Sequence, residues 1–258
     1  MPSRTYQTQA IIIKKTKLGE ADRILTLFTP GFGKIQAVAR GVRRPKSKMA
    51  GHLELLTCSQ LSLSRGRNLD IITACQTIDS FLPLKDDLTL TAYALYVTEL
   101  TEQFTTERQE NPGLFTLLLE TLQRLCQANN KDIILRHYEL QLLNESGYRP
   151  ELRQCVSCGE TLEPVTNYFS PSAGGILCPS CSRTQSYIYP LSVNALKVMR
   201  LLQDNDITTA LKLKINSALA AELEVILRRY VKYLLEREVK STVWLDDLKT
   251  SLPLPKPD

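Results

Sequence analysis

Four of the seven cysteines form two C-x2-C pairs, Cys155-Val-Ser-Cys158 and Cys178-Pro-Ser-Cys181, with 19 residues between them. Thiolate pairs at this spacing are typical of two knuckles that share one tetrahedral zinc ion. Four thiolates close the coordination shell and leave no position for a reacting water, so such an ion stabilises structure and does not catalyse. We therefore predict one structural zinc ion per chain, held by Cys155, Cys158, Cys178 and Cys181.

Two other uses of these thiols stay open at this point, a redox C-x-x-C site and an iron–sulfur cluster. A thioredoxin-like site needs one pair between a strand and a helix, whereas here two pairs lie in loop-like sequence. The segment between the pairs contains Tyr168, Phe169, Gly174 and Gly175, which predicts a short hairpin. The other three cysteines, Cys58, Cys75 and Cys126, lie in apolar patterns and are expected to pack as small hydrophobic residues.

The basic residues are concentrated at the N-terminal end. The formal net charge is +5, yet residues 1–80 contain 13 Lys and Arg against 5 Asp and Glu, and residues 23–53 contain no acidic side chain. A charged run is often only a solvated face, but a face that serves solubility alone normally mixes both signs. We therefore predict contacts to nucleic-acid phosphates from seven residues. They are Arg23, Lys34, Arg40, Arg43, Arg44, Lys46 and Lys48.

Motifs of common enzymes are missing from the sequence. It contains no G-x-x-x-x-G-K-[ST] phosphate loop, no G-x-S-x-G elbow and no H-E-x-x-H pair. The acidic pairs Asp86-Asp87 and Asp246-Asp247 lack an identifiable third carboxylate for a nuclease-type metal centre. We expect a protein that is not an enzyme, uses no ATP and has no small-molecule substrate.

The first eighty residues predict β-structure. Five short segments, 6–14, 22–29, 34–40, 53–63 and 69–79, are rich in β-branched and aromatic residues with partial alternation. Turn signals separate two pairs of them, at Pro30-Gly31-Phe32-Gly33 and at Arg65-Gly66-Arg67-Asn68. Five strands in so short a region predict a closed barrel of the OB type, and a sandwich fragment is the alternative.

After residue 83 the apolar spacing becomes helical, with segments at 84–104, 114–128, 132–145 and 216–238. The predicted fold class is α+β, with an OB-type β-barrel over 1–80 and a helical domain in two parts, 81–153 and 184–248. A four-cysteine zinc module over 154–183 is inserted between those parts, and 249–258 is expected to be a flexible tail. The longest apolar runs are only a few residues and no export signal is visible, so we expect a cytoplasmic protein that is not associated with membrane.

Several of these residues together resemble the RecO family of bacterial DNA repair proteins. The N-terminal part of the resemblance rests on Gly19-Glu20-Ala21-Asp22-Arg23-Ile24 and Ala39-Arg40-Gly41-Val42-Arg43-Arg44-Pro45. It continues in Gly147-Tyr148-Arg149-Pro150, in the four paired cysteines and in Gly174-Gly175, and it ends near Lys240-Ser241. Members of the family differ in whether they retain the cysteines, and this chain has all four.

The resemblance implies an OB-fold followed by a helical domain with a zinc insert, a role as a recombination mediator and a place at the nucleoid. Such proteins bind single- and double-stranded DNA, anneal complementary strands and act with the partner RecR. They also help the recombinase to displace the single-stranded-DNA-binding protein (SSB) from gaps. Because the barrel offers only Tyr6, Phe28 and Phe32 as aromatic residues, and Phe28 is expected in the core, we expect sequence-independent binding through the DNA backbone.

The SSB contact is predicted from composition alone. SSB tails are acidic with an apolar end, so their receptor should combine a hydrophobic groove with cations. Residues 114–143 offer Arg124, Lys131 and Arg136 for this contact. Two other functions stay open on the sequence, an RNA-binding OB-fold protein of the translation apparatus and a protein-interaction scaffold.

Overall fold

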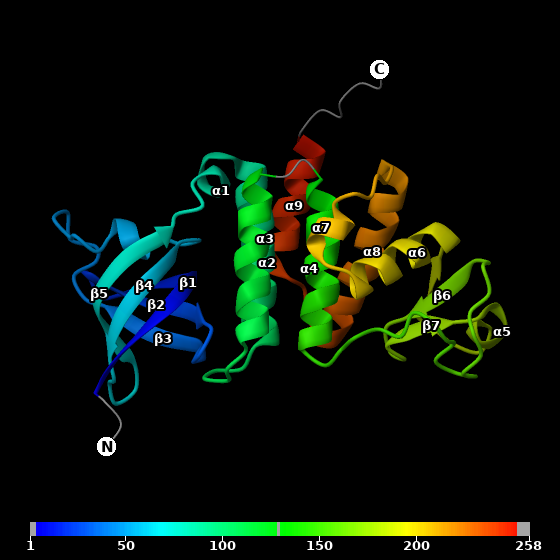
Figure 1. Cartoon of the computed structure of the whole chain (residues 1–258), viewed down its shortest axis with the longest axis horizontal. Coiled ribbons are helices and arrows are strands. Elements are labelled where there is room, and N and C mark those ends of the chain that lie inside the picture. The colour runs from blue at the N-terminus through cyan, green and yellow to red at the C-terminus, as the bar shows by residue number, and fades with distance from the viewer. Residues whose placement is uncertain (1–3, 128–129, 252–258) are drawn as a thin grey trace. The chain divides into compact units, whose positions relative to one another are not determined.

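The computed structural model describes residues 4–127 and 130–251. The chain divides into two compact units, one of residues 1–127 with 241–258 and the other of residues 128–240. Figure 1 labels most of the helices and strands of both units. Among the described helices, none combines the length and the apolar character needed to cross a membrane.

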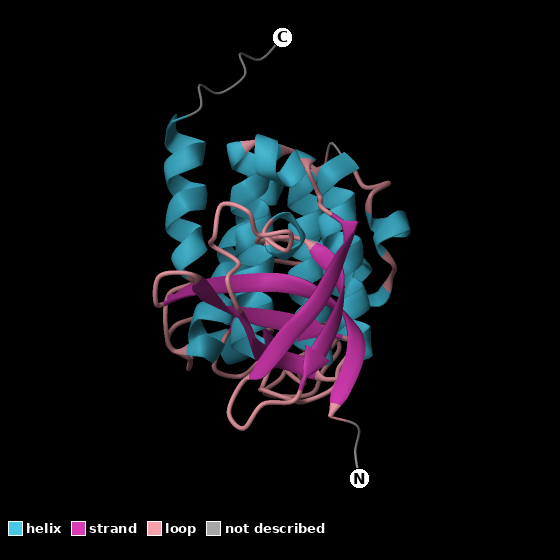
Figure 2. Cartoon of the chain, turned by 90° about the vertical axis from the view of Figure 1, so that its left-hand side faces the viewer, coloured by secondary structure: helices cyan, strands magenta, loops and turns pink. Residues whose placement is uncertain are grey.

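Five strands of the first unit close into a barrel in the order β1-β2-β3-β5-β4. Figure 2 looks onto these strands, drawn in magenta. The strands are β1 (Thr5–Leu18), β2 (Asp22–Thr29), β3 (Gly33–Ala39), β4 (Cys58–Ser64) and β5 (Asp70–Asp79). A parallel pairing of β3 with β5, in which Ala37 is opposite Asp70, joins the antiparallel pairs into the closed sheet. This confirms the predicted OB-type barrel, since a sandwich fragment would leave open edges.

Alternation along β3 explains how its sequence fits the barrel. Ile35, Ala37 and Ala39 point into the core while the residues between them are half-buried. The strand starts at Gly33, whose φ of +60° is left-handed, and a Cβ there would lie 1.9 Å from the Gln109 backbone oxygen. Glycine is therefore the residue that this tight turn and close approach require.

The fourth predicted strand began too early. Residues Gly51–Leu53 form a 3-10 turn (η1), and β4 begins only at Cys58. Leu56 has a φ of 55°, which a β-strand cannot contain, although its side chain is buried. The apolar residues Leu53 and Leu56 are therefore buried from turn backbone and not from a strand.

The helices of the first unit are α1 (Pro83–Asp86), α2 (Leu88–Phe104), α3 (Pro112–Gln127) and α9 (Lys240–Ser251). The Asn111 side-chain oxygen accepts a hydrogen bond from the Leu114 backbone N–H (2.8 Å) and so caps α3, with Pro112 at its first position. Helix α9 extends three residues into the segment expected to be a flexible tail. The rest of that segment, 252–258, lies outside the described residues.

The second unit combines helices with a small sheet. Its helices are α4 (Lys131–Glu145), α5 (Pro179–Ser182), α6 (Val193–Asp204), α7 (Ile207–Ala210) and α8 (Ser217–Leu235). Its sheet has the order β7-β6-β8, from β6 (Asn167–Ser170), β7 (Gly175–Leu177) and β8 (Tyr189–Leu191). Strand β8 was not predicted, because three residues containing Pro190 carry no strand signal of their own.

Helix α4 is the most buried helix of this unit and corrects one predicted contact. Arg136 is only 2% exposed, its guanidinium lies 2.6 Å from the Glu139 carboxylate, and a second nitrogen lies 3.8 Å from the Glu224 carboxylate. A buried arginine of this kind needs its carboxylates to offset the loss of hydration. Its guanidinium does not reach the protein surface, so Arg136 is removed from the predicted SSB contact.

Candidate metal centre and candidate nucleic-acid interface

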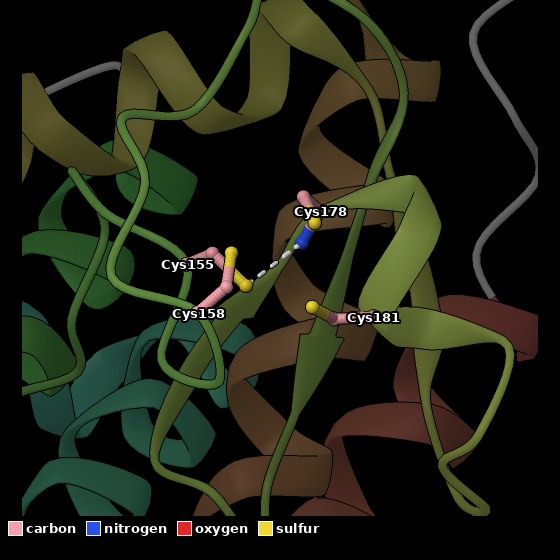
Figure 3. A group of neighbouring side chains, drawn as sticks. All are labelled: Cys155, Cys158, Cys178 and Cys181. Carbon is pink, nitrogen blue, oxygen red and sulfur yellow. Dashed lines mark hydrogen bonds between the residues drawn. The ribbon is translucent and has the colours of Figure 1, made fainter.

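The four paired cysteines meet at one point of the second unit (Figure 3). Their sulfur atoms all lie within 4.8 Å of one another, although the first pair lies in a loop and the second at the short helix α5. Zinc–thiolate bonds of about 2.3 Å in a tetrahedron place the sulfurs roughly 3.8 Å apart, so the cluster needs only a small contraction to hold an ion. Within the described parts of the chain, this is the one group of three or more Cys, His, Asp or Glu side chains found close enough to bind a metal.

Backbone hydrogen bonds shape each knuckle. The Cys155 N–H donates to the Glu160 carbonyl and the Gly159 N–H donates to the Cys155 carbonyl, both at 2.8 Å. Gly159 has a φ of +76°, which closes the first turn. The Cys178 N–H donates to the Cys155 sulfur at 3.3 Å and so ties the second knuckle to the first.

The hairpin between the knuckles fixes their separation. Strands β6 and β7 pair with Phe169 opposite Ile176, and both side chains are fully buried. At Gly175 a Cβ would lie 2.6 Å from both the Glu151 carbonyl oxygen and a Val156 methyl carbon, so a larger residue would separate the strand from the first knuckle. The predicted hairpin is confirmed.

The pKa values of Cys155 and Cys181 are shifted in opposite directions in this cluster. Burial acts to raise the pKa of Cys155, but hydrogen bonds from the backbone N–H groups of Cys178, Cys158 and Ser157 outweigh it and lower the value to about 6. A side-chain hydrogen bond with Ser157 lowers the pKa of Cys181, but the thiols of Cys178 and Cys158 outweigh it and raise the value to about 12. The four thiols can all lose their protons when a cation offsets the repulsion between the resulting thiolates. Four soft sulfur donors are suited to a thiophilic metal ion.

The two histidines are occupied elsewhere. His52 Nδ1 lies 2.8 Å from the Thr77 hydroxyl, and His137 Nε2 lies 3.1 Å from the Asn205 carbonyl oxygen. Both therefore serve packing and hydrogen bonding, and the candidate metal centre consists of thiols alone.

The basic loop, defined here as residues 40–48, follows β3 and is held by backbone contacts. The Gly41 N–H donates to the Asp22 carboxylate (2.7 Å), and the Arg43 N–H donates to the Ala21 carbonyl (2.9 Å). Val42 is 5% exposed and packs into the barrel core. The five basic side chains of the loop, by contrast, are all exposed: Arg40, Arg43, Arg44, Lys46 and Lys48. An anchored loop thus carries a group of exposed cations.

The other two predicted phosphate contacts lie outside this loop. Arg23 is half-buried on β2, where its strand partners are Lys17 on β1 and Ala39 on β3. Lys34 is half-buried, and its ammonium group donates at 2.6 Å to the carbonyl oxygens of both Glu102 and Thr105 at the end of α2. The negative end of a helix attracts a cation in this way, so Lys34 joins the barrel to α2.

Lys17 is a further basic residue of this surface that the sequence does not predict. Lys17 is exposed and pairs in register with Arg23, which places it beside β2. Its signal is the antiparallel register of β1 and β2, which the sequence alone does not supply. Lys17 extends the cationic surface beyond the basic loop.

The residues predicted for the SSB tail are found in different settings. Arg124 is half-buried in a groove of about 790 Å³ that also includes Leu82, an apolar side chain 58% exposed. The same groove contains the carboxylates of Asp79 and Glu120. Lys131 is half-buried at the start of α4.

The comparisons with known proteins agree with this architecture. The family model described as recombination protein O N terminal matches residues 1–81, and the model described as recombination protein O C terminal matches residues 85–242. The "DNA repair protein RecO" of Dehalococcoides mccartyi is 49% identical over 94% of this chain and 96% of that protein. The proteins of the same name from Roseiflexus sp. and Symbiobacterium thermophilum are 42% and 35% identical, over 100% and 95% of this chain and 90% and 98% of their own lengths. The chain therefore belongs to the RecO family of DNA repair proteins, which act in recombination.

Proposed function

We propose that this protein is a non-enzymatic recombination mediator that binds single- and double-stranded DNA, anneals complementary strands and assists recombinase loading on SSB-coated gaps without ATP. The observation that carries the proposal is the basic loop, an anchored loop with five exposed cations on an OB-type barrel. Family membership supports a role in recombinational repair and, with it, work at chromosomal DNA.

The charge of the loop suits annealing. Two complementary strands repel each other, and a basic surface that replaces their counterions reduces that repulsion without nucleotide hydrolysis. Phosphate contacts of this kind position a strand but do not read its bases. Binding through the loop should therefore be independent of base sequence and strongly dependent on salt.

The aromatic residues of the barrel are engaged within the protein. The Tyr6 and Phe32 rings lie 4.6 Å apart, and the Arg65 guanidinium lies 5.2 Å above the Tyr6 ring. The Tyr6 hydroxyl donates to the Asp70 carboxylate at 2.6 Å. These contacts leave the barrel's tyrosine little freedom to stack on a base, which supports backbone-dominated binding there.

Zinc is the metal that we propose for the four thiols. Four cysteine sulfurs within 4.8 Å of one another match the donor set of a closed structural zinc site. Its role would be to hold the two knuckles together, because a three-stranded sheet of short strands has little core of its own.

RecR and SSB are proposed as partners. For the acidic, apolar SSB tail we retain Arg124, whose groove offers the exposed Leu82 beside a cation. Lys131 lies in the other unit and is kept as a separate candidate contact. Charge reversal at Arg124 should slow annealing of SSB-coated strands and leave annealing of bare strands unchanged. Equal rates on coated strands for the Arg124→Glu variant and the unmodified protein would remove this groove as the SSB contact.

Competition between DNA and RNA separates the proposal from an RNA-binding role in translation. A labelled single-stranded DNA bound to the protein should be displaced by unlabelled DNA at least as well as by RNA of the same sequence and length. Displacement by RNA at a tenfold lower concentration would favour the RNA-directed role. Lack of any nucleic-acid binding would favour a protein-interaction scaffold.

A further inference from the structure

A second surface suited to nucleic acid lies in the second unit, beside the cysteine cluster. A groove of about 920 Å³ runs between residues 185–189, which lead into β8, and the C-terminal half of α8. Its aromatic lining residues are Tyr187, Tyr189 and Tyr233. Arg229 and Lys232 are its basic lining residues and Glu236 its acidic one. We call these residues the tyrosine groove.

The aromatic rings of this groove face solvent to an unusual degree. Tyr187 is 81% exposed and Tyr233 is 50% exposed. The Arg229 guanidinium lies 4.0 Å above the Tyr189 ring, a cation–π arrangement that places a positive charge over the aromatic surface. Exposed aromatic residues grouped in one groove are typical of a binding site, whereas scattered single ones are ordinary.

The loop that carries Tyr187 is anchored at both ends. On one side lies Cys181 of the candidate metal centre, with the Gln185 N–H donating to the Ser182 carbonyl at 3.2 Å. On the other side Tyr189 pairs with Phe169 in the small sheet. Between these anchors Tyr187 has a φ of 57°, a strained left-handed conformation for a non-glycine residue that is found preferentially at binding sites.

The combination of exposed rings with cations favours one class of ligand. Proteins that bind single-stranded nucleic acid without sequence preference place bases on aromatic side chains and lead the backbone past basic residues. Arg183, two residues before the groove-lining Gln185 in sequence, is exposed and adds a cation to the same loop. Lys232 is paired with Glu238 on the surface, an exposed ion pair that a phosphate can replace at little cost. A duplex hides its base faces, so this surface distinguishes single strands from duplex DNA.

We propose that the tyrosine groove binds single-stranded DNA by stacking bases on Tyr187 and Tyr233, with Arg229 and Lys232 contacting phosphates. The metal centre positions the Tyr187 side of the groove through Cys181. The inference rests on the proposed DNA-binding function and gives it a second, strand-selective site separate from the basic loop.

The test compares alanine and phenylalanine at the two exposed tyrosines of the full chain. Tyr187→Ala with Tyr233→Ala should weaken binding to single-stranded oligonucleotides roughly 30-fold or more, because two base–aromatic stacks are lost. The salt dependence and the affinity for duplex should stay near those of the unmodified protein. Tyr187→Phe with Tyr233→Phe should bind as the unmodified protein does, because both rings are kept. A single strand containing 2-aminopurine should show quenching with the phenylalanine pair and lose it with the alanine pair.

The metal link is tested by combining variants. In a protein already carrying Cys155→Ser and Cys178→Ser, adding the two tyrosine-to-alanine changes should weaken single-strand binding much less than it does in the metal-binding protein. If the tyrosine-to-alanine changes weaken single-strand binding by the same factor with and without the two cysteine-to-serine changes, the metal centre does not position the groove.

Three results would overturn the groove itself. The first is an unchanged affinity of the folded alanine pair for single strands, and the second is an equal loss of its affinity for duplex DNA. The third is an alanine pair that loses affinity for an acidic SSB-tail peptide only. Failure of the broader function looks different, because the unmodified protein would then bind no DNA at all.

Discussion

Replacing Arg43, Arg44 and Lys46 together by alanine should weaken binding to single-stranded DNA by on the order of 100-fold at about 0.1 M salt. Removing one phosphate contact reduces the slope of log affinity against log salt by roughly 0.7 on single strands, so removing three lowers it by about 2. The loop's backbone anchors to Asp22 and Ala21 stay in place. Fluorescence anisotropy over a series of salt concentrations measures both quantities.

A matched control removes the same charge elsewhere. Lys197, Lys212 and Lys214 are exposed in the second unit, and their triple alanine variant lowers the net charge equally. It should retain affinity and salt slope, which separates a local contact from an effect of total charge. Thermal stability of the loop variant should stay near that of the unmodified protein, because exposed charges contribute little to folding. An unaltered salt slope in a folded loop variant would show that this loop is only a solvated face.

Loss of the metal should have the second large effect. Purified protein should contain about one zinc ion per chain, and Cys155→Ser with Cys178→Ser should lose it, because each change removes one thiolate from a different knuckle. The hairpin between the knuckles should then open. Trypsin should cut faster after Arg153 and Arg183, exposed arginines that lie on either side of the cysteine segment. Elemental analysis and timed proteolysis measure the two outcomes.

A cysteine outside the cluster supplies the control. Cys126→Ser changes a half-buried thiol of the other unit and should leave the zinc content unchanged. Zinc retained at full stoichiometry in the double serine variant would exclude the four-thiolate site. Iron in place of zinc in freshly purified protein would instead support the iron–sulfur alternative.

Local signals account for the features that the sequence predicted well. The second strand was predicted with its observed limits, Asp22–Thr29, because apolar residues run up to a proline–glycine turn. The spacing of the two cysteine pairs predicts that the four thiols lie close together, because a shared metal ion requires its ligands to converge. The hairpin between them follows from glycines placed where the backbones approach closely.

Long-range contacts account for the features that it did not predict. From its sequence context Arg136 is predicted to be a surface cation. Its burial is explained by its ion pairs with Glu139 and with Glu224, which is distant in sequence. Lys34 is predicted from the sequence to contact phosphate. In the structure its ammonium group donates hydrogen bonds to the carbonyl oxygens of Glu102 and Thr105 at the end of α2. The tyrosine groove was not predicted at all, because the α8 residues that complete it follow Tyr187 by some forty positions.

The most direct test of the account measures annealing of complementary single strands, bare and SSB-coated, without ATP. The unmodified protein should accelerate annealing of both, and the Arg43→Ala, Arg44→Ala, Lys46→Ala variant should lose most of that acceleration on both. Absence of acceleration by the unmodified protein, or equal acceleration by the folded loop variant, would contradict the claim that this barrel loop brings DNA strands together.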